Sequence, residues 1–173
     1  MDLSVYKTGF AWSTQPVIID PFDEESIISA MGAGRKFDLP TLLRPTQSYL
    51  FAVEQRIVVP DNLMGLICLR STMARLSLIA PPTIADPGFR GFLTMELTNA
   101  SPNYIRIHPS MFLWDMVMVP SLEPVYIGRY QDQGSGVAPP KVLDWGREQA
   151  KHKAILDASS LPNDPEQTNE VPA

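Results

Sequence analysis

Short apolar segments separated by turn residues dominate the chain from Leu42 onward. Pro, Gly, Asn and Asp gather between the segments, in runs such as PDNLMG, ADPGFRG and NASPN. Strands of this length and spacing are typical of an all-β barrel or sandwich. We predict strands in SYLFAVEQRIVV, MGLICLR, GFLTMELTN, NYIRIHP and MFLWDMVMV, which begin at residues 48, 64, 91, 103 and 111. The pattern therefore predicts a mostly β fold, a distorted barrel or a jelly-roll-like sandwich.

A different pattern near the start of the chain predicts a helix. Asp20 suits the N-cap, Pro21 suits the first turn, and the acidic residues 23–25 favour the positive end of the helix dipole. Gly32 or Gly34 is expected to end the helix. This N-terminal helix is therefore predicted to be short.

Three later stretches also depart from the strand pattern. STMARLSL, residues 71–78, indicates one or two helical turns between strands, and a C-terminal helix is predicted near Leu143 to Ala158. The last residues, 159–173, have the composition of a disordered tail. The chain then divides into an N-terminal arm, a β domain and a C-terminal extension, at residues 1–17, 18–135 and 136–173.

Composition narrows the class of protein. A chain of 173 residues, 45% of them apolar, fits one domain with tails. The net charge of -5 and the pI near 5.0 disfavour binding to nucleic-acid polymers. A single cysteine, Cys68, and two distant histidines exclude an internal disulfide and a zinc-type cluster. No apolar run reaches the roughly 18 residues that cross a bilayer, and no signal peptide is evident, so we expect a soluble, cytoplasmic protein without membrane contact.

Motifs in a fixed order resemble the dCTP deaminase family. RSTMAR, residues 70–75, is similar to the family's Arg-Ser-Ser/Thr-x-Ala-Arg motif. DPGFRGFLTMELTN, residues 86–99, is similar to its Asp-Pro-Gly-aromatic-x-Gly run, which leads into a strand that carries a glutamate. RYQDQG, residues 129–134, is a weaker match. The resemblance implies the fold shared with trimeric dUTPases, a homotrimer with sites shared between subunits, and hydrolytic deamination of dCTP to dUTP or dUMP.

Glu96 is the candidate general acid and base. Deamination at C4 of cytosine needs an activated water and a proton delivered to N3 and then to the leaving amine. The residues alone favour a solvated glutamate on the outer face of a half-buried sheet, and the resemblance reverses that preference. Arg75 and the Ser71 hydroxyl would then hold Glu96 ionised and fix a water against it, without a metal. By alternation, the residues on the polar face of this strand are Phe92, Thr94, Glu96 and Thr98.

A phosphate site is predicted at the start of the RSTMAR motif. Arg70, Ser71 and Thr72 combine a guanidinium group, two hydroxyl groups and backbone N–H groups at the start of a helical turn, a combination that suits a triphosphate. From this tripeptide alone, an ordinary helix cap with a surface arginine is an equal alternative.

The resemblance implies further substrate contacts. Asp86 would face the 3′-hydroxyl and Phe89 would pack on the deoxyribose, although a turn former and a core aromatic are the alternatives. Arg129 and Gln133 would reach phosphate and base, with a flexible polar tail as the alternative. Thr83 is a further substrate-binding candidate. It follows Pro81 and Pro82 in APPTIA, which is shorter than the family's usual hairpin and leaves open how the base is read.

Two other functions remain open at this stage. A dUTP diphosphatase would use Asp86 to orient a water, with Mg²⁺ on the phosphates. A non-catalytic trimer that binds a nucleotide or a protein partner is the second alternative. For the deaminase, Mg²⁺ is expected only as an ion bound to the substrate triphosphate, with no protein ligands.

Overall fold

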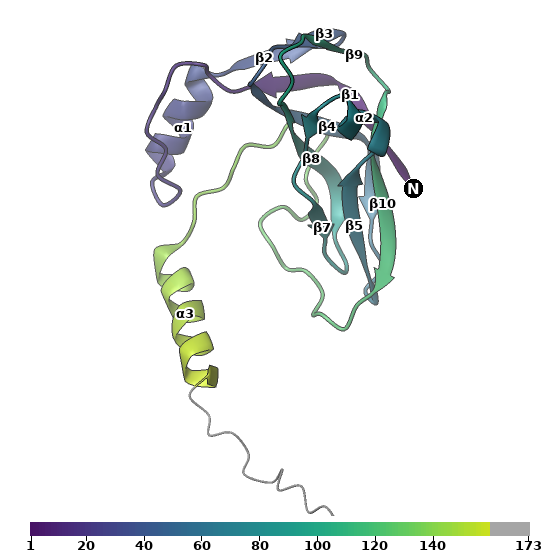
Figure 1. The fold of residues 1–173 in the computed structure, drawn as a ribbon. Helices are drawn as coiled ribbons and strands as arrows, with labels where there is room; N and C mark the ends of the chain where they lie inside the picture. Colours follow the sequence, from purple (N-terminus) through teal and green to yellow (C-terminus); the bar gives the residue numbers. More distant parts are fainter. Residues whose placement is uncertain (160–173) are drawn as a thin grey trace, which may run out of the picture.

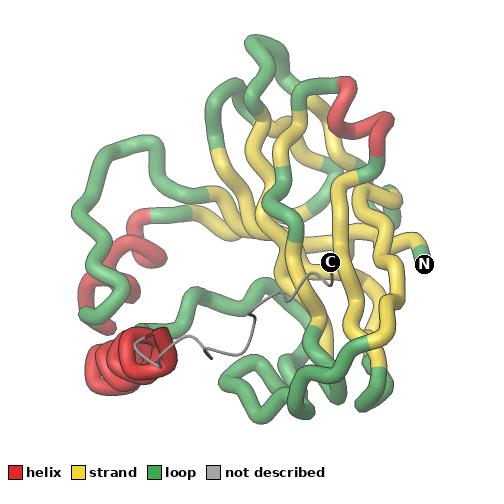
Figure 2. The backbone as a smooth tube through the Cα atoms, turned by 60° about the horizontal axis from the view of Figure 1, so that its bottom comes forward, coloured by secondary structure: helices red, strands yellow, loops and turns green. Residues whose placement is uncertain are grey.

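The computed structural model describes residues 1–159, and within them eight strands form one curled sheet (Figures 1 and 2). Neighbouring strands are antiparallel in the order β6-β8-β4-β1-β10-β5-β7, and β2 also pairs with β1. The strands are β1 Asp2–Ala11, β2 Arg35–Asp38, β4 Ser48–Val58, β5 Leu63–Leu69, β6 Leu78–Ile79, β7 Thr83–Ala85, β8 Arg90–Asn99 and β10 Phe112–Pro120. A separate ribbon pairs β3 Thr41–Leu43 with β9 Ile105–Ile107. The mostly β prediction is confirmed, with 41% strand and 15% helix in a half-barrel.

The strands predicted from the sequence are β4, β5, β8, β9 and β10. One face of these strands packs on a core built around Phe51, Met95 and Trp114, which are fully buried. Burial of such large side chains supplies most of the driving force for the fold. The remaining strands were not predicted. Four of them have only two to four residues, too few for a periodic pattern to stand out.

β1 is the larger difference from the sequence prediction. Residues 2–11 were assigned to an N-terminal arm, but they lie between β4 and β10, inside the sheet. Leu3 and Val5 are fully buried. The register shifts between Leu3 and Ser4 against β10, and between Val5 and Gly9 against β4. These irregularities break the alternation of apolar residues, so the strand is hidden in the sequence.

The helices lie where the sequence predicted them, but not every helix begins at the predicted residue. α1, Glu24–Ala33, begins later than predicted, because the carboxylate of Asp23 accepts the N-capping hydrogen bond from Glu25 N at 3.0 Å. Asp20 instead forms a turn, accepting a hydrogen bond from Phe22 N at 2.9 Å. α1 ends at Gly34, as predicted.

The other two helices were also predicted. α2, Ser71–Arg75, forms the helical turn between β5 and β6. α3, Trp145–Ser159, stands away from the sheet in both views (Figures 1 and 2). The predicted disordered tail, apart from Ser159, lies outside the described residues. None of the helices described is both long enough and apolar enough to cross a membrane.

Candidate functional site

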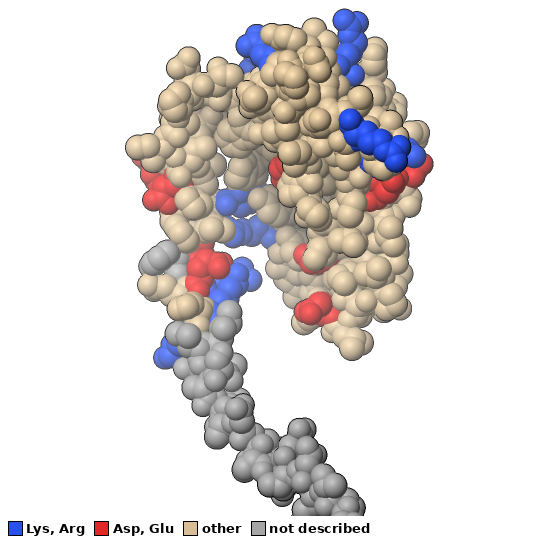
Figure 3. All heavy atoms as spheres, in the orientation of Figure 1, with Lys and Arg blue, Asp and Glu red and all other residues tan. Residues whose placement is uncertain are grey.

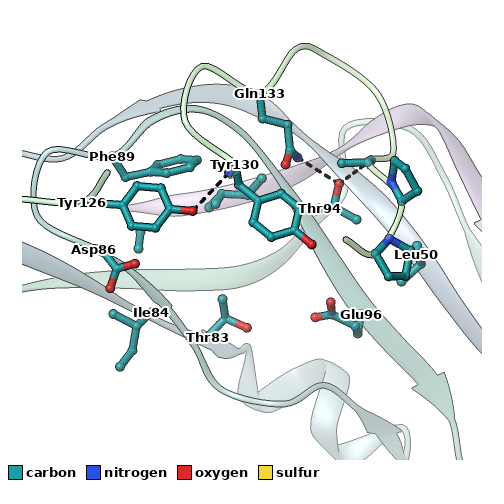
Figure 4. A pocket seen from close by; sticks show the side chains of 15 residues that line it. Leu50, Thr83, Ile84, Asp86, Phe89, Thr94, Glu96, Tyr126, Tyr130 and Gln133 are labelled. Carbon is teal, nitrogen blue, oxygen red and sulfur yellow. Dashed lines mark hydrogen bonds between the residues drawn. The ribbon is translucent and has the colours of Figure 1, made fainter. Parts of the chain in front are cut away.

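A pocket of about 320 Å³ lies between the sheet and the C-terminal segment 121–144, which we call the strap (Figure 4). Strands β4, β7 and β8 form one side of the pocket and the strap forms the other. The lining side chains range from apolar and aromatic to carboxylate. They are Leu50, Thr83, Ile84, Ala85, Asp86, Phe89, Leu93, Thr94, Glu96, Tyr126, Tyr130, Gln133, Ala138, Pro139 and Pro140.

β8 carries the candidate glutamate. Its alternate residues Leu93, Met95 and Leu97 are buried in the core. Thr94 and Glu96 therefore project from the opposite face, and both line the pocket. In Figure 4, Asp86, Thr83 and Glu96 lie along one side of the pocket, opposite the residues of the strap. The alternation read from the sequence is confirmed, and it brings Glu96 to the pocket.

The strap is held by backbone hydrogen bonds at the start of β8. Asp132 N donates to Arg90 O at 2.7 Å, and Phe92 N donates to Gln133 O at 2.9 Å. Gly91, between the two β8 residues, has a φ of +144°, and a Cβ atom there would lie 2.8 Å from Gln133 N. A side chain at Gly91 would collide with the strap backbone, so glycine permits this close approach.

Thr94 links the strap to the sheet at the centre of the pocket. Its Oγ1 accepts a hydrogen bond from Gln133 Nε2 at 3.2 Å and another from Ala138 N at 2.8 Å. Alternation along β8 places Thr94 on the polar face, but its residue type alone indicates no role. Its position on the same face as Glu96 is the sequence feature that points to the pocket.

Aromatic rings close one end of the pocket. Phe89 is only 5% exposed, and its ring centroid lies 6.1 Å from that of Tyr126. The Tyr126 hydroxyl accepts a hydrogen bond from Tyr130 N at 3.1 Å, and the Tyr130 hydroxyl accepts one from Lys141 N at 3.1 Å. Phe89 is therefore both a core aromatic and a wall of the pocket. Sequence analysis did not single out Tyr130.

Asp86 lies in the turn that joins β7 and β8. Its carbonyl oxygen accepts a hydrogen bond from Phe89 N at 3.1 Å, and Gly88 has a φ of +75°. The carboxyl group lines the pocket. Burial raises the pKa of Asp86, and the negative charge of Glu123 raises it further. Asp86 thus forms the turn and also presents a carboxyl group to the pocket.

The segment before Asp86 is not the hairpin that the sequence comparison with the family suggested. β6 pairs with β8, whereas β7 pairs with β5, so the two strands around Pro81 and Pro82 have different partners. Both prolines are exposed and neither lines the pocket, whereas Thr83 does. Because proline has no N–H donor, this connection cannot continue a hairpin ladder.

The RSTMAR residues lie outside this pocket. Arg70, Ser71, Thr72 and Arg75 belong to α2 and its N-cap, and none of them lines the pocket. The N-cap is Arg70 and makes no side-chain capping bond, so this is not an ordinary Ser/Thr cap. The guanidinium group of Arg70 lies 3.8 Å from Asp2 and 3.7 Å from Asp115.

Of the two predicted substrate-binding residues on the strap, only one lies in the pocket. Gln133 lines the pocket, whereas Arg129 is exposed and donates a hydrogen bond to Val142 O. Of the predicted site residues, the structure gathers Thr83, Asp86, Phe89, Glu96 and Gln133. Among the residues described, no group of three or more His, Cys, Asp or Glu side chains is placed to hold a metal ion.

Comparison with known proteins agrees with this arrangement. The family model described as dCTP deaminase-like matches residues 34–119. A dCTP deaminase from Caldivirga maquilingensis is 33% identical over 144 residues, which cover 83% of this chain and 80% of that protein. The chain belongs to the dCTP deaminase family.

Other members of the family match over a shorter span. A dCTP deaminase from Pyrobaculum neutrophilum is 40% identical over 103 residues, 59% of this chain and 58% of that protein. The crystal structure of a 2′-deoxycytidine 5′-triphosphate deaminase from Agrobacterium tumefaciens has a similar fold, with a TM-score of 0.55 and 13% identity. That likeness covers 68% of this chain and 38% of the Agrobacterium chain.

Proposed function

We propose that this dCTP deaminase family member hydrolyses dCTP, replacing the C4 amino group of cytosine with oxygen. The observation that carries the proposal is Glu96, a carboxylate that faces the pocket without a hydrogen bond or ion pair among the described contacts. Thr83 and Asp86 share its side of the pocket. A free carboxylate in a partly enclosed pocket suits repeated proton transfer.

Glu96 would act first as a base and then as an acid. It would accept a proton from a water as the water oxygen bonds to C4, and would pass that proton to N3. A second proton, from the new C4 hydroxyl group, would reach the amino group by the same carboxylate as the C4–N bond breaks. The products of these steps are ammonia and dUTP, and dUMP would form only if a second water then attacked the α-phosphorus and released pyrophosphate.

The pocket would also position the nucleotide. Asp86 would accept a hydrogen bond from the 3′-hydroxyl, and the ring of Phe89 would pack beside the sugar, where a ribose 2′-hydroxyl would be crowded. Gln133 would reach the base from the strap. The Thr94 bonds to Gln133 and Ala138 support this, because they hold the strap against the sheet beside Glu96.

The α2 residues would come from a neighbouring copy in a homotrimer. Within one chain, Ser71 and Arg75 are absent from the pocket that contains Glu96. All interfaces of a closed symmetric ring are equivalent, so an α2 surface that meets the neighbouring pocket at one interface would do so at every interface. Ser71 and Arg75 would then meet Glu96 across the interface, and Arg70 and Thr72 would bind the triphosphate.

Exposed apolar side chains support such an assembly. Leu66 of β5 lies opposite Ile84 of β7 and Val117 of β10, and the exposed fractions of all three exceed one third. A contiguous apolar row of this kind marks an association surface. Phe112, at the start of β10, is exposed as well.

Mg²⁺ would enter with the substrate triphosphate. It would neutralise phosphate charge, while the chain's own contribution would be the positive charge of Arg70 and Arg129. The only pocket carboxyl groups are Asp86 and Glu96, among the residues that the structure describes. These two carboxyl groups are consistent with a Mg²⁺ ion that is held by the substrate triphosphate.

Asp86 supports one second candidate, a dUTP diphosphatase. Its carboxyl group lies in the same pocket and could orient a water toward the α-phosphorus. That reaction releases pyrophosphate and makes no use of Glu96. The two reactions can therefore be separated by one variant.

The test is to incubate the protein with dCTP or dUTP and Mg²⁺, and to measure ammonia and pyrophosphate. We expect ammonia from dCTP, and a loss of at least about 100-fold in Glu96→Gln, the lower end of general acid–base contributions. Glu25→Gln, an exposed change in α1, is the matched control. Pyrophosphate from dUTP that survives Glu96→Gln would establish the diphosphatase. No product from either nucleotide would refute both reactions.

A further inference from the structure

The β3–β9 ribbon presents a second face, and the residues that line it are different from those that line the pocket of Glu96. Leu42 of β3 lies opposite Arg106 of β9, and Arg44 and Tyr104 lie just beyond the ends of the two strands. Leu43 is fully buried, whereas Leu42 is 46% and Tyr104 is 64% exposed. Two arginines, one tyrosine and one leucine are thus brought to one cavity on the outer face.

This outer face is hollowed. A cavity of about 510 Å³ opens there, and it shares no lining residue with the pocket of Glu96. Its lining consists of Pro40, Thr41, Leu42, Arg44, Tyr104 and Arg106. Figure 3 shows basic side chains at the upper end of the molecule, where β3 and β9 lie, and no acidic side chain beside them in that view.

Among residues 1–159, which the structure describes, no carboxylate lines this cavity to neutralise its charge. The ion pairs found among the described residues involve Arg56, Arg70 and Lys151, and none involves Arg44 or Arg106. In a chain of net charge -5, two arginines that share a cavity without an acid form a local site for an anion.

The backbone beneath the site is held rigidly. Asn99, which is fully buried, donates from Nδ2 to Leu43 O at 3.1 Å and to Asn103 O at 2.7 Å. Arg44 N donates to the Tyr49 hydroxyl at 2.6 Å. These bonds fix the strand that carries Arg44 and the loop that leads to Tyr104. Binding here would order little additional backbone, which favours affinity.

Positive charge extends below the ribbon as well. Burial raises the pKa of the Tyr49 hydroxyl, while the charges of Arg44 and then of Arg35 oppose that rise. Arg35 and Arg44 therefore both act on this hydroxyl group, although Arg35 does not line the cavity.

We propose that the outer face of the β3–β9 ribbon binds a nucleotide at a site separate from the Glu96 pocket. Arg44 and Arg106 line the same cavity, so their two guanidinium groups can converge on one phosphate or on a diphosphate. The exposed ring of Tyr104 offers a stacking surface for the base. The negative charge of the whole chain favours a single nucleotide over a polymer.

The experiment is calorimetric titration of the full chain with ADP and, separately, with inorganic pyrophosphate. We expect Arg44→Gln and Arg106→Gln each to weaken ADP binding at this site by about ten-fold, the scale of a charge-assisted hydrogen bond. Arg147→Gln removes the same charge from exposed α3 and should change affinity less than about two-fold. Tyr104→Ala should weaken ADP binding and leave pyrophosphate binding unchanged, because only the base would contact the ring.

Two results would overturn the proposal. Arginine variants that bind ADP as tightly as wild type would show that the cavity is not an anion site. Tyr104→Ala with unchanged ADP affinity would show that no base binds there. Since all three side chains are exposed, the variants should keep the wild-type Tm, which serves as the folding control. Ammonia release from dCTP is measured in parallel, so failure of the proposed deaminase reaction remains distinguishable.

Discussion

The proposed reaction needs residues from two regions, the β8–strap pocket with Glu96 and the α2 turn with Ser71 and Arg75. Within one chain, the α2 residues do not line the pocket. The pocket is complete in itself as a binding cavity, because the strap folds back onto β8 through backbone bonds and through Thr94. α2 makes no such closure. Its side chains other than that of Met73 are exposed or, at Arg70, bonded to acids of the same chain.

This contrast shows that neighbouring motifs in sequence need not meet in one subunit. RSTMAR ends at Arg75 and the β8 motif begins at Asp86, yet none of the α2 residues lines the pocket. A site that needs both would require a second copy. The following experiments separate a shared site from a site built by one chain.

The largest expected effect is recovery of activity when two inactive variants are mixed. Glu96→Gln and Arg75→Ala should each be nearly inactive alone. If a site takes Glu96 from one copy and Arg75 from its neighbour, an equal mixture of subunits restores both residues in about one quarter of the sites. Co-expression of two tagged variants and measurement of ammonia release provide the test.

A second mixture of two variants serves as the control for this experiment. Glu96→Gln mixed with Asp86→Ala should show no more activity than the Asp86→Ala subunits give alone, because both residues line the pocket of the same copy. No recovery in the first mixture would place Arg75 and Glu96 in one chain's site, and recovery in the second would show that Asp86 and Glu96 act from different copies.

Arg70→Ala should have the next largest effect, through the triphosphate. We expect about a ten-fold loss in dCTP affinity, since a charge-assisted hydrogen bond to phosphate disappears. The ion pairs with Asp2 and Asp115 are partly exposed and longer than 3.5 Å, so stability should change little. Asp115→Asn, which leaves Arg70 in place, should bind dCTP at least as tightly as wild type. Equal binding by the two variants and the wild type would make Arg70 a structural residue only.

The sequence predicted those parts of the molecule that follow a regular period. Alternation in β8 placed Glu96 and Thr94 on one face, and burial in the structure follows the same alternation. Turn residues located the Asp86 turn. β1 was missed because two register shifts break its pattern, and β7 was missed because it has three residues.

The strap was harder to predict than the strands. Its course depends on single bonds to β8 and on the positive φ of Gly91, which leave no periodic trace. The sequence pointed to Gln133 through the family resemblance, but gave no sign that Thr94 would receive its side chain. Long-range polar contacts of this kind are decided by tertiary packing.

Thr94→Val tests the strap side of the comparison and should have a smaller effect than Arg70→Ala. Valine keeps the shape but removes the acceptor for Gln133 Nε2 and Ala138 N, so the strap should close less often. We expect KM for dCTP to rise by about five-fold. Thr98→Val is the matched control on the same strand and face, where the hydroxyl bonds only Ser48. A rise in KM of equal size in both variants would remove any special role for Thr94.

Asp86→Asn should give the smallest effect, a change in the pH dependence of stability. Burial, with a contribution from Glu123, raises the pKa of Asp86 above its ordinary value of 3.8. A carboxyl group whose pKa is higher in the folded state favours folding when protonated, and this contribution is lost as the pH rises through the folded pKa. Asparagine stays neutral, so the variant should gain Tm over wild type at pH 7 but not below pH 3.8.

Glu123→Gln should give a gain of the same sign at pH 7, because it removes the neighbouring negative charge, and the gain should vanish when Asp86 is already asparagine. Thermal melts of the single and double variants across this pH range measure both effects. A Tm difference that is constant with pH, or a loss at pH 7, would mean that Asp86 serves the turn alone. Among the described pocket residues, Glu96 would then be the one carboxylate offered to a substrate, and the contrast between the pocket and α2 would rest on it.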